Sequence, residues 1–109
     1  MKMLVFRGSA LTDLRAFPNS ARREAGYQLD KVQNEQPPTD WKPMTTVGKG
    51  VLEIRIRDET GAFRVIYTVK FAEAIYVLHC FQKKTQKTSK TDLDLAAKRY
   101  SDLMKELGH

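Results

Sequence analysis

Residues 51–71, VLEIRIRDETGAFRVIYTVKF, contain two runs in which apolar and polar residues alternate. Such alternation is typical of strands that bury one face of a sheet. The turn-forming residues 58–61 separate the two runs, so the stretch predicts a β-hairpin. One side of the hairpin is expected to carry Leu52, Ile54, Ile56, Phe63, Val65, Tyr67 and Val69. The other side is expected to carry Glu53, Arg55, Arg57, Arg64, Ile66 and Thr68.

Two further strands are predicted outside the hairpin. Met3–Phe6 is a short apolar run rich in β-forming residues, and Gly8 with Ser9 ends it. Residues 74–81, AIYVLHCF, are almost wholly apolar, which is typical of a central strand that is covered on much of both faces. The hairpin and residues 74–81 are therefore expected to form a three-stranded meander.

Apolar residues at helical spacing predict three helices. The first is expected to start at a capping residue, Ser9, and to end at Pro18, which cannot continue the hydrogen-bond ladder. The second follows at once. The third is expected to start at Thr91, which forms a capping signature with Asp94, and to end at Gly108. The apolar positions are Leu11, Leu14 and Phe17, then Ala21, Ala25, Leu29 and Val32, then Leu93, Ala96, Ala97, Tyr100, Leu103, Met104 and Leu107.

The order β-α-α-β-β-β-α predicts an α+β fold: an antiparallel-rich sheet of about four strands, two N-terminal helices and one C-terminal helix. Residues 34–50, NEQPPTDWKPMTTVGKG, contain three prolines and are not expected to form regular structure. A loop of this length is either packed, here by Trp41 and Met44, or a functional excursion, and packing is the favoured alternative.

The composition describes one small basic domain. The chain has 109 residues, of which 41% are hydrophobic, so one domain over residues 1–109 is expected and a two-domain enzyme is excluded. No run approaches the roughly 20 apolar residues that span a bilayer, and the start lacks a signal-peptide apolar region, so we expect a soluble, cytoplasmic protein. Lys and Arg number 19 against 13 Asp and Glu, and this charge of +6 favours polyanionic partners, although solubility alone explains many basic surfaces.

Redox, metal and cofactor chemistry have little support in the sequence. Cys80 is the single cysteine, and with only His79 and His109 beside it a four-ligand zinc site is not expected. Cys80 is interpreted as inert core and His79 as a structural histidine on an apolar strand. The GKG at residues 48–50 lacks the flanking pattern of a phosphate-binding loop. We therefore expect no metal and no cofactor.

The hairpin predicts a cluster of cations. Arg55, Arg57 and Arg64 come from adjacent strands, and the next strand delivers Lys83 and Lys84 at its carboxyl end. A solvated sheet face is the simpler interpretation of the arginines alone. The added lysines favour a phosphodiester-binding patch, because an arginine fork and mobile lysine charges complement each other on phosphate oxygens.

The segment after this strand, QKKTQKTSK at residues 82–90, contains no acidic residue. It is either a charged connector or part of the same patch, in which hydroxyls beside cations suit phosphate and sugar contacts. The candidate RNA-binding residues are Arg57, Lys87, Thr88, Lys90 and Phe81. Phe81 and Tyr67 are capable of stacking on a base, but aromatics in an alternating strand more often belong to the core.

Several words of the sequence resemble the phage-derived branch of the RelE/HigB toxins, the toxins of bacterial type II toxin–antitoxin pairs. The words are GYQL, DWKPM, VGKGVLEIRIRD, GAFRVIY, VLHCFQKKTQKT and DLDLAAKRY, and they extend over nearly the whole chain. The order of EIRI, FRVIY and HCFQKKTQKT is the most specific part. The resemblance implies a RelE-like fold, with helices on one face of the sheet and a basic concave surface on the other.

The resemblance also implies a metal-independent endoribonuclease, or mRNA interferase, which cuts mRNA on the ribosome and inhibits translation. Its implied partner is a cognate antitoxin, commonly a helix-turn-helix repressor. The family's basic catalytic positions match Arg55, Arg64, Lys83 and Lys84. The implied reaction is attack of a ribose 2′-hydroxyl on the adjacent phosphate. Arg64 would stabilise the developing charge, and a lysine would act as base where neighbouring cations or burial lower its pKa.

The chain departs from the better-known relatives in its candidate acid. Several of them use a tyrosine or histidine near the C-terminus, whereas Tyr100 here lies on an apolar helical stripe and His109 is terminal. Three alternatives stay open for protonating the leaving 5′-oxygen: Thr88, Lys87, or a geometry that the ribosome supplies. Two other functions stay open: a polyanion-binding protein that does not cut, and a related toxin that acts on a protein target such as gyrase.

Overall fold

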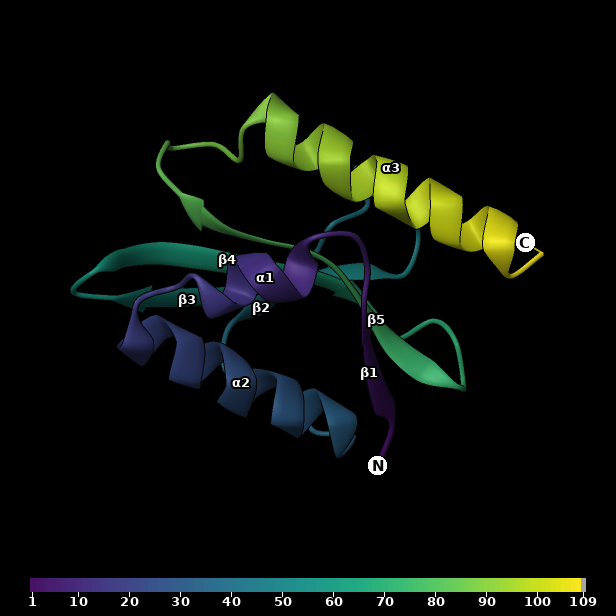
Figure 1. The fold of residues 1–109 in the computed structure, drawn as a ribbon, viewed down its shortest axis with the longest axis horizontal. Helices are drawn as coiled ribbons and strands as arrows, with labels where there is room; N and C mark the ends of the chain where they lie inside the picture. Colours follow the sequence, from purple (N-terminus) through teal and green to yellow (C-terminus); the bar gives the residue numbers. More distant parts are fainter. Residues whose placement is uncertain (109) are drawn as a thin grey trace.

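The computed structural model describes residues 1–108 and shows one mixed sheet of five strands (Figure 1). The strands are β1 (Met3–Phe6), β2 (Trp41–Pro43), β3 (Val51–Asp58), β4 (Gly61–Thr68) and β5 (Ala74–Lys83). Their order across the sheet is β1-β5-β4-β3-β2. β1 runs parallel to β5, and the other neighbours are antiparallel. The predicted α+β class, antiparallel-rich sheet and meander are confirmed.

Three helices complete the fold: α1 (Ala10–Arg15), α2 (Asn19–Gln33) and α3 (Lys90–Glu106). The predicted β-α-α-β-β-β-α order holds apart from one added strand, so the sheet has five strands instead of about four. Along residues 1–108, the structure contains no helix with the length and apolar character needed to cross a membrane.

The added strand β2 lies in the segment that we expected to be irregular. Trp41 pairs with Ile54 and Pro43 with Leu52, so β2 forms the outer edge of the sheet beside β3. An edge position tolerates proline, which has no N–H to donate. Met44 is buried, whereas Trp41 is 43% exposed, so the packing predicted for this loop is confirmed for Met44 and is only partial for Trp41.

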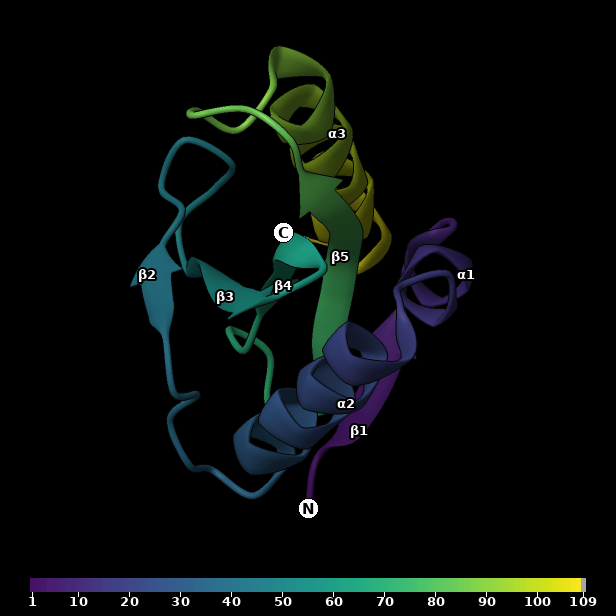
Figure 2. The same ribbon diagram turned by 90° about the vertical axis from the view of Figure 1, so that its left-hand side faces the viewer.

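The helices cover opposite faces of the sheet. α1 and α2 pack over a core that contains Ile54, Val65 and Val77, whereas α3 packs with Ile66 and Leu78 on the other face. Figure 2 shows α2 and α3 separated by the curved sheet. The expectation of helices on one face is therefore wrong for α3, because the apolar residues of β5 require cover on both sides.

The hairpin register agrees with the predicted faces. Arg55 lies opposite Arg64, and Glu53 lies opposite Ile66. Asp58 closes the turn by accepting a hydrogen bond from the Thr60 amide at 2.8 Å. This register places Arg55, Arg57 and Arg64 on the face of the hairpin opposite Ile54 and Val65.

The third helix begins earlier than predicted. Ser89 is its N-cap, and the Ser89 hydroxyl accepts a hydrogen bond from the Asp92 amide at 3.1 Å. The predicted Thr91 cap is therefore wrong by two positions, because Ser89 already satisfies the first free amides of the helix. At α1, Ser9 is the N-cap residue as expected, but its hydroxyl donates to the Asp13 carboxylate instead of capping an amide.

Candidate nucleic-acid interface

A hollow lined by cations lies where β3, β4 and the end of β5 meet. We call it the basic hollow; its volume is about 360 Å³, and it is lined by Arg57, Ala62, Arg64, Lys83, Lys84, Thr85 and Gln86. The sheet register explains the grouping, because Arg57 lies opposite Ala62 and Ala62 lies opposite Lys83. Residues that are paired across antiparallel strands share a face, so three strands deliver their cations to one place.

Arg64 is the buried member of the basic hollow, with an exposed fraction of 7%. Its Nη1 donates to the Phe63 carbonyl at 3.0 Å, and its Nε lies 3.6 Å from Glu53 Oε1. Burial lowers the pKa of Arg64, and the neighbouring Glu53 carboxylate opposes this effect. Two fixed contacts hold the guanidinium in one orientation while it lines the hollow, which suits the recognition of phosphate oxygens.

Glu53 is the residue of this site that the sequence did not nominate. It is 1% exposed, and Lys42 Nζ lies 3.9 Å from the same Oε1 that faces Arg64. Burial raises the pKa of Glu53, although Lys42, Arg64, Lys83 and Arg55 favour its ionised form. Its Oε2 has no hydrogen-bond partner within the described chain. The sequence feature that could have indicated Glu53 is that it is the single acidic residue beside Arg55 and Arg57 on that side of β3.

Lys83 stands at the wall of the basic hollow and is partly buried. Burial lowers its pKa, and the positive charge of Arg64 lowers it further. A lysine in this setting releases its proton more readily than a lysine in water, which is the requirement for a general base. Lys84 lines the same hollow.

Arg55 lies outside the basic hollow. Its Nη2 and Nε contact Asp40 Oδ1 at 2.9 and 3.1 Å, and its side chain lines a different hollow together with Glu24 and Gln28 of α2. The sequence predicted that Arg55 and Arg64 share one face of the hairpin, and the structure pairs them directly across β3 and β4. Register alone did not reveal Asp40, which the loop before β2 brings alongside.

The remaining candidates fall into three settings. Lys87 and Thr88 line a second hollow that adjoins the basic hollow at Lys83. Lys90 pairs with Asp94 on the exposed surface of α3, with Nζ 2.6 Å from Oδ2. Phe81 is buried and stacks on the His79 ring, with 4.8 Å between the ring centroids. Tyr67 is also buried, which raises its pKa to about 12, so both aromatics belong to the core.

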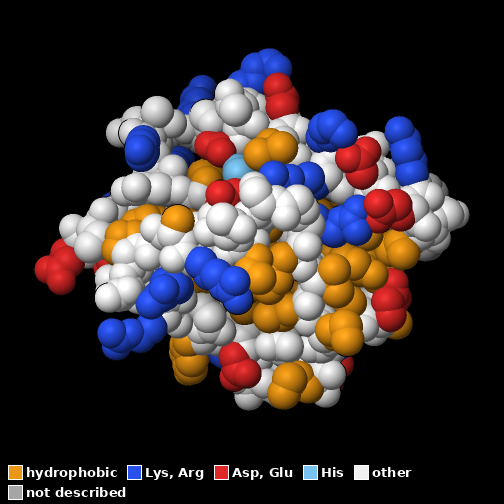
Figure 3. Space-filling model, viewed as in Figure 1, with side chains coloured by type: hydrophobic (Ala, Val, Ile, Leu, Met, Phe, Trp, Pro, Cys, Tyr) orange, Lys and Arg blue, Asp and Glu red, His pale blue; other side chains and the backbone are white. Residues whose placement is uncertain are grey.

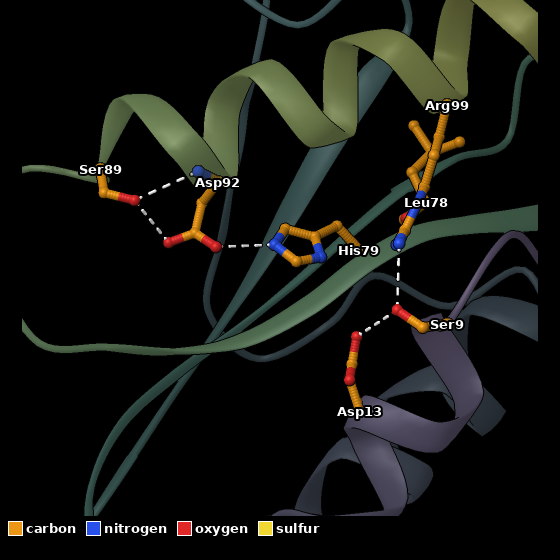
Figure 4. Close-up of polar contacts among 7 residues, drawn as sticks. All are labelled: Ser9, Asp13, Leu78, His79, Ser89, Asp92 and Arg99. Atoms are coloured by element: carbon orange, nitrogen blue, oxygen red, sulfur yellow. Dashed lines mark hydrogen bonds and ion pairs between the residues drawn. The ribbon is translucent and has the colours of Figure 1, made fainter.

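His79 takes part in a polar network between β5 and α3 (Figure 4). Its Nε2 lies 2.7 Å from Asp92 Oδ1, and Asp92 Oδ2 accepts a hydrogen bond from the Ser89 hydroxyl at 2.7 Å. Nearby, Arg99 donates to the Leu78 carbonyl at 2.9 Å. These contacts join α3 to the strand, which fits the structural interpretation of His79.

The other groups considered for chemistry lie apart from the basic hollow. Cys80 is buried, and burial raises its pKa. The Tyr100 hydroxyl donates to the Lys49 carbonyl at 2.8 Å, and His109 lies outside the described residues. Over residues 1–108, no group of three His, Cys, Asp or Glu side chains is arranged to hold a metal ion.

Positive charge is not confined to one face. In Figure 3, which has the view of Figure 1 with α1, α2 and α3 all in sight, Lys and Arg side chains also occur, but Asp and Glu side chains are interspersed among them. The basic hollow differs from that surface because no Asp or Glu is among its lining residues. Local composition, more than net charge, distinguishes the candidate site.

Comparison with known protein families agrees with this architecture. Residues 12–101 match the family described as Phage derived protein Gp49-like (DUF891). The chain therefore belongs to the Gp49-like family of phage-derived proteins, a toxin-like family related to the RelE/HigB type. No curated protein matches the chain.

Proposed function

We propose that this protein is the toxin of a toxin–antitoxin pair and acts as a metal-independent endoribonuclease on mRNA. The observation that carries the proposal is the gathering of Arg57, Arg64, Lys83 and Lys84 around one hollow without a lining carboxylate. Membership of the Gp49-like family is compatible with a toxin and with an antitoxin partner. We further propose that the substrate is cut on the ribosome and that the antitoxin is a helix-turn-helix repressor.

The proposed reaction breaks one phosphodiester bond without another reactant. The ribose 2′-oxygen forms a bond to the adjacent phosphorus, and the bond from phosphorus to the 5′-oxygen breaks. The 2′-hydroxyl proton goes to a base, and the 5′-oxygen takes a proton as it leaves. The products are a 2′,3′-cyclic phosphate and a 5′-hydroxyl end.

The basic hollow offers a residue for each role. Arg64, held by Glu53 and by the Phe63 carbonyl, binds the phosphate and stabilises the charge that develops on it. Lys83 is the proposed base, because burial and Arg64 lower its pKa. Lys84 lines the same hollow and is the proposed proton donor to the 5′-oxygen. Arg57 adds a further phosphate contact at the exposed rim.

The test is expression of the protein and its variants in bacteria, with growth measured and new RNA 5′ ends mapped by primer extension. Arg64→Ala and Lys84→Ala are expected to abolish both growth arrest and new 5′ ends. Arg23→Ala is the matched control, because Arg23 is an exposed cation on α2, which covers the opposite face. Circular dichroism of the purified variants checks that each still folds.

Two outcomes contradict the proposal. If both variants still cleave RNA, the basic hollow is not the cleavage site. Growth arrest without new 5′ ends excludes an endoribonuclease and favours a toxin with a different target.

A further inference from the structure

A second hollow lies beside the basic hollow, and Lys83 and Gln86 line both. Its volume is about 430 Å³, and its walls come from the loop after β2 and from the loop between β5 and α3. The lining residues are Lys42, Pro43, Met44, Thr45, Thr46, Lys83, Gln86, Lys87, Thr88 and Leu93. Figure 2 shows these two loops facing each other at the open side of the sheet.

The wall formed by residues 44–50 is fixed to the rest of the fold. Met44 and Val47 are buried, and the Met44 amide donates to the Val51 carbonyl at 2.8 Å. The Tyr100 hydroxyl donates to the Lys49 carbonyl, so α3 holds the far end of the loop. Gly48 lies so close to Tyr100 that a Cβ there would be 2.4 Å from the ring. A hollow with such a wall is formed before any ligand arrives, which lowers the entropy lost on binding.

The chemistry of the second hollow matches a nucleotide. Lys42, Lys83 and Lys87 provide charge for phosphate oxygens. Met44 and Leu93 provide apolar surface for the face of a base. The neutral polar groups, which suit the edge of a base, belong to Thr45, Thr46, Gln86 and Thr88. As in the basic hollow, no carboxylate is among the described lining residues.

We propose that the second hollow binds the nucleotide next to the bond that is cut and reads its base. One RNA strand that crosses Lys83 occupies both hollows, with the scissile phosphate on Arg64 and the neighbouring base against Met44 and Leu93. The threonines of the loop after β2 then set a base preference. The cutting step rests on the proposed function, whereas the binding of a single-stranded nucleotide is testable without it.

The test uses RNA that cannot be cut, because each 2′-hydroxyl carries a methyl group. Fluorescein-labelled 2′-O-methyl hexanucleotides, which differ by one base at one position, are titrated with the full-length protein by fluorescence anisotropy. Thr45→Val and Thr46→Val keep the side-chain shape and remove the hydroxyl. At least one of them is expected to change the ratio of affinities between the preferred base and another base by about five-fold or more.

A lysine variant tests the phosphate contact. Lys87→Gln is expected to weaken binding of all hexanucleotides alike and to reduce the slope of log affinity against log salt by about 0.7. Lys49→Gln is the matched control, because Lys49 is an exposed lysine of the loop after β2 and does not line the hollow. It is expected to bind as the wild type does.

The proposal is overturned when both threonine variants keep the wild-type base preference and Lys87→Gln keeps the wild-type affinity. This result is separable from a failure of the proposed function. Cleavage retained by Arg64→Ala rejects the cutting site and leaves the binding assay valid. Loss of base preference in a threonine variant supports the second hollow whether or not the protein cuts RNA.

Discussion

Glu53 and Arg64 form a diagonal ion pair across β3 and β4, with Glu53 Oε1 3.6 Å from Arg64 Nε. The pair is diagonal because Glu53 lies opposite Ile66 and Arg64 lies opposite Arg55. The carboxylate therefore approaches the guanidinium from the side and leaves other N–H groups to line the hollow. A buried acid thus orients the residue that we assign to the phosphate.

Glu53→Gln is expected to change how stability depends on pH. Burial raises the pKa of Glu53 in the folded protein above its ordinary value of 4.5. This carboxyl therefore favours the folded state at low pH, and its contribution is lost as the pH rises from about 4.5 through the raised pKa. Over this range the free energy of unfolding of the wild type falls with rising pH relative to that of Glu53→Gln. The fall is at most about 1.4 kcal/mol per pH unit. Urea denaturation of both proteins at several pH values measures this difference. Plots of unfolding free energy against pH that run parallel for the two proteins would contradict the prediction.

Cleavage is expected to become faster as the pH rises, because only the neutral amine of Lys83 accepts a proton. Its pKa is lowered from 10.5, so the midpoint of the rate profile should lie below that value. Lys83→Arg keeps the charge and removes the base, and it should lower the rate by about a hundredfold or more and flatten the profile. The measurement is the initial rate on a short RNA between pH 6 and 9, corrected for uncatalysed cleavage. An unchanged profile in Lys83→Arg would assign the base to another residue.

Arg55→Ala is expected to be much milder than Arg64→Ala. The Arg55 guanidinium is occupied by Asp40, and both side chains are solvent-accessible, so their pairing contributes at most about 1 kcal/mol to stability. We expect cleavage to fall by less than about tenfold in Arg55→Ala and by about a hundredfold or more in Arg64→Ala. Initial rates on the same RNA compare the two variants. An equal loss of cleavage rate in both would show that Arg55 acts in catalysis as Arg64 does.

Ser89→Ala is expected to destabilise the protein by about 1 kcal/mol, because it removes the side-chain cap of α3. The variant also removes the hydrogen bond that Ser89 donates to Asp92, the partner of His79. Thr91→Ala is the matched control and should change stability by less than about 0.5 kcal/mol. Urea denaturation measures both. A larger loss in Thr91→Ala would restore the cap that the sequence pattern predicted.

Two glycines provide opposite tests of packing. Gly48→Ala places a methyl group against the Tyr100 ring and should destabilise the protein by about 1–3 kcal/mol. Gly26→Ala, on the exposed side of α2 with no atom within 4 Å of the new Cβ, should stabilise it by about 0.5–1 kcal/mol. Thermal unfolding monitored by circular dichroism measures the stability of both variants. An unchanged stability of Gly48→Ala would show that the wall of the second hollow moves to accommodate the methyl group.

Local patterns predicted most of the fold. The hairpin followed from alternation, and β5 followed from its continuous apolar run, because both signals depend only on neighbouring residues. β2 was missed because a three-residue strand that ends in proline has no pattern of its own. It forms only because β3 offers a free edge.

The candidate site was predicted less completely. Arg64, Lys83 and Lys84 were nominated together, and the hairpin register together with β5 brings them around one hollow. The diversion of Arg55 to Asp40 was not predictable, because it depends on the path of an irregular loop. Glu53 was overlooked because burial, and not residue type, makes it important.

The parallel pairing of β1 with β5 has a consequence during synthesis. Met3 pairs with Ala74 and Phe6 with Val77, so the first strand of the chain has no partner until most of the protein has been made. Lys83 and Lys84 emerge later still. A prematurely terminated polypeptide therefore lacks both the completed sheet and the cations of β5, so the basic hollow forms only after β5 has been synthesised.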